Sequence, residues 1–174
     1  AEVARLMADR VDLILCETVA SVTHARAILE GALAAGKPVW VSFTVDDEDG
    51  SRLRSGERVA EAASAMADGG ADAILANCAA PEAMPAALDA IAPTGLPCGA
   101  YGNAFTRITK DFLRDAPTAD SQTPRRDMGP DTYAEHALSW LDHGATILGG
   151  CCETGPAHIA EIARRLRAAG HQIV

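Results

Sequence analysis

The sequence has few aromatic residues and a deficit of positive charge. Its 174 residues include only three Phe, two Trp and two Tyr, and 15 Lys and Arg stand against 24 Asp and Glu, so the net charge is −9. Nucleic-acid-binding surfaces use clustered cations and aromatic stacking platforms, and anionic membranes also attract basic patches. The composition therefore argues against nucleic acids and membrane surfaces as partners.

Long apolar runs and a disulfide framework are also missing. No stretch approaches the roughly 20 apolar residues of a membrane-spanning helix, and no signal-peptide pattern opens the sequence. The five cysteines are an odd number without the spacing of a small disulfide-rich domain. We therefore expect a cytoplasmic protein, folded as a single domain over residues 1–174, whose thiols are buried, catalytic or metal-bound.

What the sequence does contain is a repeated unit, in which a short apolar run is followed by polar loop residues and an alanine-rich helix. Continuous apolar runs indicate strands buried on both faces, and their alternation with helices predicts parallel strands joined by right-handed crossovers. A doubly wound sheet and a (β/α)8 barrel both fit, but no Gly-x-Gly-x-x-Gly follows a strand, which disfavours dinucleotide binding. The predicted strands cover residues 11–16, 38–43, 73–77, 96–101 and 145–149.

Polar and thiol residues gather where these strands end. In both architectures ligands bind at the carboxyl ends of the parallel strands, so these side chains are the candidate site. They are Glu17, Ser42, Asn77, Cys78, Asn103, Cys151 and Cys152. We expect the acidic loop at residues 46–50 to be a solvated loop near the same end, because its spacing does not match a calcium-binding loop.

The cysteines give the most specific chemical signal. Cys151 and Cys152 follow two glycines that allow the chain to turn, and Cys78 occupies the equivalent place two strands earlier. Three thiolates from two strand ends would form an open zinc site with one vacant position. The spacing alone also fits buried, unreactive thiols, which is our interpretation of Cys16 and Cys98 within strands.

Several motifs occur in the order of a known family. They are residues 12–18 (DLILCET), residues 41–44 (VSFT), Asn77-Cys78 with Pro81, Tyr101-x-Asn103, and Gly149-Gly150-Cys151-Cys152 with Pro156 and His158-Ile159. Together they resemble strands four to eight, the carboxyl-terminal half, of the zinc-dependent homocysteine S-methyltransferases. That resemblance implies a (β/α)8 TIM-type barrel of roughly 300 residues. We count five strand-helix units here, so the amino-terminal units would form a missing barrel segment.

The resemblance also implies a reaction and a metal. Homocysteine would accept a methyl group on its thiol to form methionine, with S-methylmethionine or S-adenosylmethionine as the donor. Cys78, Cys151 and Cys152 would be the ligands of Zn²⁺, which promotes deprotonation of a bound thiol.

The remaining candidates would bind substrate or orient the metal site. Under the same resemblance Glu17 would pair with the homocysteine ammonium. Ser42 and Asn103 would hydrogen-bond the amino-acid end or orient the zinc ligands, and Asn77 is a further candidate for orienting those ligands. From the residues alone, Glu17 could instead cap the helix that follows it, and Asn103 could be a turn residue after Gly102.

Two other interpretations of the whole chain stay open. One is a catalytically incomplete zinc-binding fragment of such a barrel, and the other is an unrelated α/β domain whose cysteines are only structural. An open five-unit sheet would expose the edge of its first strand, so we expect the isolated chain to associate unless further residues complete the sheet.

Overall fold

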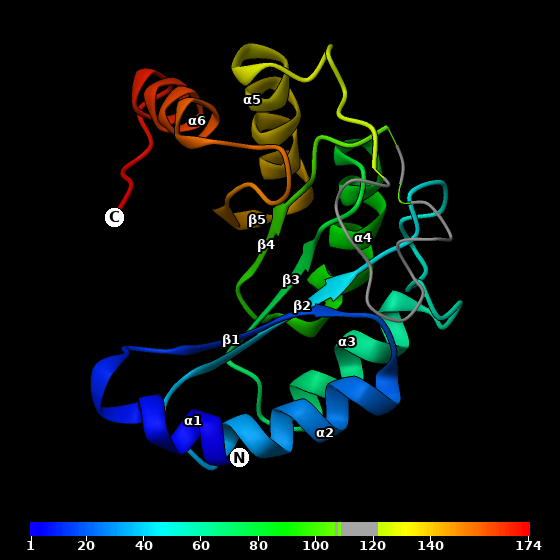
Figure 1. Cartoon of the computed structure of the whole chain (residues 1–174), viewed down its shortest axis with the longest axis vertical. Helices are drawn as coiled ribbons and strands as arrows, with labels where there is room; N and C mark the ends of the chain where they lie inside the picture. The colour runs from blue at the N-terminus through cyan, green and yellow to red at the C-terminus, as the bar shows by residue number, and fades with distance from the viewer. Residues whose placement is uncertain (107, 109–121) are drawn as a thin grey trace.

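Five parallel strands form one sheet in a computed structural model that describes residues 1–106, 108 and 122–174 (Figure 1). The strands are arranged in sequence order and every neighbouring pair is parallel. This confirms the predicted α/β fold and corresponds to part of a TIM-type barrel. The strands are β1 (Ile14–Val19), β2 (Val39–Thr44), β3 (Ala73–Asn77), β4 (Cys98–Tyr101) and β5 (Ala145–Leu148).

Helices connect successive strands and begin and end at recognisable signals. The Ser21 hydroxyl caps the second helix by accepting a hydrogen bond from the His24 amide, and Gly144 takes a left-handed conformation before β5. The α-helices are α1 (Glu2–Met7), α2 (Val22–Leu33), α3 (Val59–Asp68), α4 (Met84–Ile91), α5 (Pro130–Ser139) and α6 (Pro156–Ala168). Short 3₁₀ segments are η1 (Ala8–Arg10), η2 (Pro81–Ala83), η3 (Ala92–Thr94) and η5 (Trp140–His143).

The core lies between the sheet and its helices, of which α2, α3 and α4 cover one face of the sheet (Figure 1), and α5, η5 and α6 add further buried residues. Half of the buried residues on α2, α3 and α4 are alanine, so these helices can lie close to the strands. Buried residues on these helices are Ala25, Leu29, Ala32, Val59, Ala62, Ala63, Ala65, Met66, Met84, Ala87, Leu88 and Ile91.

The register of the sheet places polar residues in one row. Thr44 pairs with Asn77, and Asn77 pairs with Tyr101, so the three side chains point to the same face at the carboxyl end of the sheet. Thr44 and Asn77 are buried and Tyr101 is half-buried. The strand ends that the sequence marks as the candidate site therefore meet at one edge of the sheet.

The first strand lies further along the chain than predicted. The apolar run suggests residues 11–16, but pairing begins when the Ile14 amide bonds to the Pro38 carbonyl and continues to Val19. The register shifts between Cys16 and Val19, where Thr18 has φ +60°. Glu17 consequently lies inside β1 rather than after its end, because backbone pairing and not hydrophobicity sets the limits of a strand.

The acidic loop after β2 is not fully solvated, contrary to our expectation. Asp47 is only 14% exposed and forms an ion pair with Arg54 at 3.1 Å. Gly50 is buried against Ala83, and a side chain at that position would overlap the Ala83 carbonyl. The loop is thus packed on the turn that follows β3.

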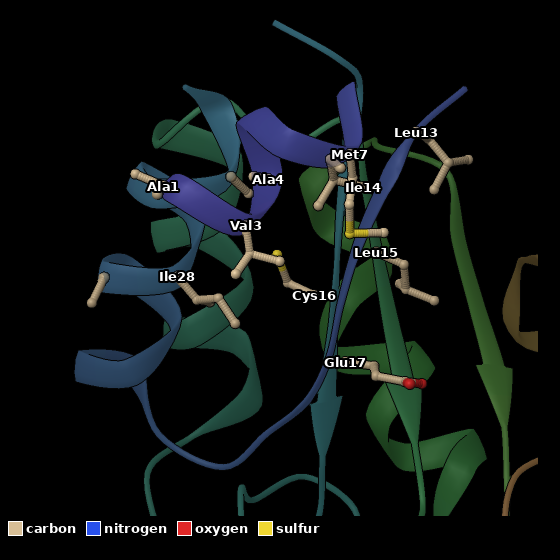
Figure 2. A pocket seen from close by; sticks show the side chains of 13 residues that line it. Ala1, Val3, Ala4, Met7, Leu13, Ile14, Leu15, Cys16, Glu17 and Ile28 are labelled. Carbon is tan, nitrogen blue, oxygen red and sulfur yellow. The ribbon is translucent and has the colours of Figure 1, made fainter. Parts of the chain in front are cut away.

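The outer edge of β1 borders an apolar cavity of about 370 Å³ between α1, β1 and α2 (Figure 2). Val3 and Met7 of α1 line it and stay exposed. Within the described ranges β1 pairs with β2 alone, which agrees with the open edge expected of a partial barrel. Among the described helices, none has both the length and the apolar character needed to cross a bilayer.

Close packing of β4 against β5 yields a stability prediction. A side chain at Gly99 would overlap the Ile147 carbonyl, whereas the space around Gly129, the residue before α5, is open. Gly99→Ser should lower the free energy of unfolding by about 1–3 kcal/mol, since an added atom forces backbone movement. Gly129→Ser should leave it unchanged or raise it, because serine is a favourable helix cap. Chemical denaturation followed by circular dichroism measures both, and equal effects would contradict the packing described.

Candidate functional site

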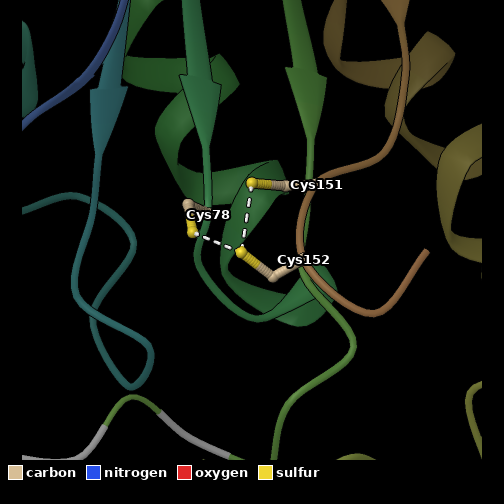
Figure 3. A group of neighbouring side chains, drawn as sticks. All are labelled: Cys78, Cys151 and Cys152. Atoms are coloured by element: carbon tan, nitrogen blue, oxygen red, sulfur yellow. Dashed lines mark hydrogen bonds between the residues drawn. The ribbon is translucent and has the colours of Figure 1, made fainter. Parts of the chain in front are cut away.

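Three thiols meet at the carboxyl end of the sheet (Figure 3). Cys78 directly follows β3, and Cys151 and Cys152 lie in the loop between β5 and α6. The Cys78 and Cys152 sulfurs are 3.8 Å apart, the Cys151 and Cys152 sulfurs are also 3.8 Å apart, and all three lie within 4.8 Å of one another. Cys16 and Cys98 are buried elsewhere in the core, as expected.

Backbone hydrogen bonds hold the loop that carries the adjacent cysteines. The Cys151 amide donates to the Gly102 carbonyl at 2.9 Å, and the Cys152 carbonyl accepts from the Ala104 amide at 2.9 Å. A side chain at Gly150 would overlap Thr154, so the turn requires glycine there. The loop after β5 is therefore hydrogen-bonded to the loop after β4. In this position the Cys151 and Cys152 thiols lie beside Cys78.

The spacing of the sulfurs fits a tetrahedral metal ion. Metal–sulfur bonds of about 2.3 Å at tetrahedral angles keep two thiolate sulfurs about 3.8 Å apart. The Cys78–Cys152 and Cys151–Cys152 sulfur pairs have this separation. Thiolates are soft ligands that select zinc and similar ions, so Cys78, Cys151 and Cys152 are suited to hold one metal ion.

The thiols also influence one another's protonation. A hydrogen bond from the Cys78 thiol lowers the pKa of Cys151 to about 6, from an ordinary value of 9.0. The same contact, together with burial, raises the pKa of Cys78. The lowered pKa favours the thiolate form of Cys151, and thiolate is the form that binds metals.

Beneath the thiols, the buried Asn77 side chain joins three strands. Its Oδ1 accepts from the Ser42 hydroxyl at 2.9 Å and from the Thr18 amide at 3.1 Å, and its Nδ2 donates to the Thr18 hydroxyl at 2.9 Å. These bonds hold Thr18 in its left-handed conformation. Nothing in the sequence marks Thr18 as part of this site, because a positive φ at a threonine has no sequence signal.

Glu17 lies on the face of β1 opposite α1 and α2. Figure 2 shows Glu17, Leu13 and Leu15 on one side of the strand, with Ile14 and Cys16 on the other. The carboxylate is exposed and accepts a hydrogen bond from the Tyr101 hydroxyl at 3.4 Å, and burial raises the pKa of Tyr101, which keeps that hydroxyl protonated. Ser21 caps α2, so the alternative interpretation of Glu17 as a helix cap is wrong.

The Asn103 side chain stabilises a turn through its oxygen, and its nitrogen has no hydrogen-bond partner among the described residues. Its Oδ1 accepts from the Phe105 amide at 3.0 Å, which is the turn contact that its sequence context suggested. The side chain is 1% exposed, and its Nδ2 is the single buried side-chain nitrogen or oxygen without a hydrogen-bond partner in the described part of the chain. Buried donors are normally satisfied, so Asn103 can serve a ligand that supplies an acceptor.

Tyr133 on α5 is a further residue beside the thiol loops that no sequence motif indicates. Its buried hydroxyl lies 2.9 Å from both the Gly102 and the Gly149 carbonyls. These carbonyls belong to the loops after β4 and β5, so the hydroxyl links the two segments that position the adjacent cysteines. Its sequence signal is only that of an apolar helix position.

Comparison with known proteins gives a consistent result. A family model described as homocysteine S-methyltransferase matches residues 1–166. The chain is 32% identical over 166 residues to homocysteine S-methyltransferase 4 from Zea mays, covering 91% of this chain and 45% of that protein. It is 28% identical over 157 residues to homocysteine S-methyltransferase YbgG from Bacillus subtilis (strain 168), covering 87% and 46%.

A solved structure shows the same similarity. The metallated form of the homocysteine methyltransferase MmuM from Escherichia coli superimposes with a TM-score of 0.68 at 27% identity, covering 92% of this chain and 47% of that one. The chain thus spans a little under half the length of the relatives it matches.

The cluster predicts selective loss of metal binding. Cys151→Ala should abolish stoichiometric binding of Zn²⁺, because two thiolates cannot hold the ion as three do. Cys16→Ala, which removes a buried thiol away from the cluster, should leave one metal ion bound per chain. Metal content after dialysis, measured by atomic emission, checks both variants. Retention of one equivalent by Cys151→Ala would contradict the proposed ligand set.

Proposed function

The chain belongs to the homocysteine S-methyltransferase family, and on that premise we propose that it carries the metal site of an enzyme that methylates the homocysteine thiol to form methionine. The observation that carries the proposal is the group of three thiols at metal-ligand spacing. Cys78, Cys151 and Cys152 would hold Zn²⁺, for which three thiolates and one open position are suitable. A zinc ion bound there supplies a Lewis-acid site that lowers the pKa of an incoming thiol.

The reaction requires a nucleophilic sulfur and a positively charged donor. The homocysteine thiol loses its proton to solvent, and the resulting thiolate forms a new sulfur–carbon bond to the transferred methyl group. The sulfur–carbon bond of a sulfonium donor breaks in the same step, and the donor leaves as a neutral sulfide. S-Methylmethionine and S-adenosylmethionine are both sulfonium compounds, so either can serve as the donor.

Three polar groups near the thiols would bind the amino-acid part of homocysteine. The exposed Glu17 carboxylate can pair with the ammonium group, and the Tyr101 hydroxyl orients that carboxylate. The unpartnered Nδ2 of Asn103 can donate to an acceptor of the substrate. The Ser42 hydroxyl donates a hydrogen bond to Asn77, which fixes its orientation. In that orientation it would bind the amino-acid end of the substrate.

A zinc-binding but catalytically incomplete fragment is the second candidate function. It is favoured by the share of the relatives' length that the chain spans, and by the free edge of β1. Such a fragment would retain Cys78, Cys151 and Cys152 and still lack groups needed to bind the amino acid.

Calorimetry of the zinc-loaded chain separates these candidates. We expect homocysteine to bind with measurable heat, and methionine to form when S-methylmethionine is added. Zinc bound at one equivalent without any homocysteine heat would favour the incomplete fragment. Absence of stoichiometric zinc would instead indicate that the cysteines are structural.

Substitution of Glu17 tests substrate binding separately from metal binding. Glu17→Gln should weaken homocysteine binding about tenfold or more, because hydrogen bonds to charged groups contribute about 1.5–3 kcal/mol. Its zinc content should not change, since Glu17 is not one of the three clustered thiols. Glu30→Gln, on the exposed face of α2, is the matched control and should alter neither quantity. Titration calorimetry with homocysteine measures the affinities, and equal values for both variants would remove Glu17 from the substrate site.

A further inference from the structure

We propose that Asp47 and Arg54 form a partly buried ion pair that positions Cys78 as a metal ligand. This inference rests on the proposed function of the three-thiol cluster and assigns a role to the loop between β2 and α3. The Asp47 and Arg54 side chains are 14% and 10% exposed, and their closest atoms, Oδ1 and Nη2, are 3.1 Å apart.

Cys78 needs external support for its backbone conformation. Its φ is +51°, in the left-handed region that costs a non-glycine residue of the order of 1 kcal/mol or more. The Cys78 carbonyl accepts from Arg54 Nη2 at 3.1 Å and lies 3.4 Å from the Thr44 hydroxyl. Arg54 Nε in turn donates to the Thr44 hydroxyl at 3.0 Å. The side chains of Thr44 and Arg54 thus fix the peptide that sets the direction of the Cys78 thiol.

Asp47 extends this support to the neighbouring loops. Its Oδ1 accepts from the Ala80 amide at 2.8 Å, two residues after Cys78. Its Oδ2 accepts from the Ile108 amide at 2.9 Å, in the segment after β4. One carboxylate therefore connects the loops after β2, β3 and β4, and the ion pair with Arg54 fixes the orientation of that carboxylate.

The two sides of the thiol cluster are held differently. The peptide groups of Cys151 and Cys152 bond to main-chain groups of Gly102 and Ala104. The Cys78 amide likewise donates to the Tyr101 carbonyl at 3.2 Å, but the Cys78 carbonyl bonds to side chains of the β2–α3 loop and its preceding strand. Loss of a group that orients a metal ligand typically lowers metal affinity about 10–100-fold. Cys78 is therefore the ligand whose geometry a substitution in this loop can alter.

The same loop supplies a matched control. Arg52 forms an ion pair with Asp49 at 3.2 Å, but both side chains are 52% exposed, and among the described residues neither side chain has a hydrogen bond or ion pair with the thiol loops. Exposed pairs contribute little to stability. Arg54→Met and Arg52→Met remove the same charge from the same segment, and they differ in whether Cys78 loses a hydrogen bond.

The experiment measures zinc affinity of the full chain by competition with a chromophoric chelator. We expect Arg54→Met to bind zinc about 10–100-fold more weakly than the unsubstituted chain, and Arg52→Met to bind it equally well. With Co²⁺ as a spectroscopic probe, Arg54→Met should show a weaker sulfur-to-metal charge-transfer band per bound ion, because one thiolate is misplaced. Arg54→Lys, which keeps the charge but loses the fork of donors, should give an intermediate affinity.

A purely structural role for Arg54 predicts something else. In that case Arg54→Met would lower the free energy of unfolding while zinc affinity and the Co²⁺ spectrum stayed unchanged, and this result would overturn the inference. Should Arg54→Met not fold, Arg54→Lys decides by the same two measurements, since unchanged affinity and spectrum would again reject it. An unsubstituted chain that binds no zinc would refute the proposed function itself. Equal zinc affinity of the unsubstituted chain and Arg54→Met would reject only the role of Arg54.

Discussion

The site depends on one geometric constraint. Sulfurs from two separate loops must lie at the distance that separates two ligands of the same metal ion. Cys78 and Cys152 satisfy it with sulfurs 3.8 Å apart, although 73 residues lie between them. Parallel strands make this possible, because their carboxyl ends reach the same edge of the sheet. A change of one residue in strand register would turn the relevant side chains to the opposite face.

Polar groups below and beside the thiols maintain this geometry. Asn77 joins β1, β2 and β3 through Thr18 and Ser42, and Tyr133 joins the loops after β4 and β5 through two carbonyls. All these groups are hydrogen-bonded, as buried polar groups need to be. Asn103 Nδ2 differs from them, because it has no hydrogen-bond partner within the described residues.

Conformational strain is concentrated at the same edge of the sheet. Thr18, Cys78 and Glu153 are the described non-glycine residues with positive φ, and each lies in or beside the candidate site. Residues held in such conformations persist when surrounding contacts determine them, and they cluster at functional sites. The bonds to Asn77 and to the β2–α3 loop supply those contacts for Thr18 and Cys78. Rigidity here suits a metal site whose ligands must be placed before the ion arrives.

The sequence alone determined the alternation of strands and helices, the order of the site residues and the family, because apolar runs, glycine and proline signals and the Gly-Gly-Cys-Cys motif are local properties of the chain. It placed β1 three residues too early and treated Asp47 as a solvated residue. Tertiary structure decided the sulfur separations, the left-handed conformation of Thr18 and the burial of Asp47 beside Arg54. Each of these depends on contacts between residues distant in sequence, and hydrophobic periodicity contains no information about such contacts.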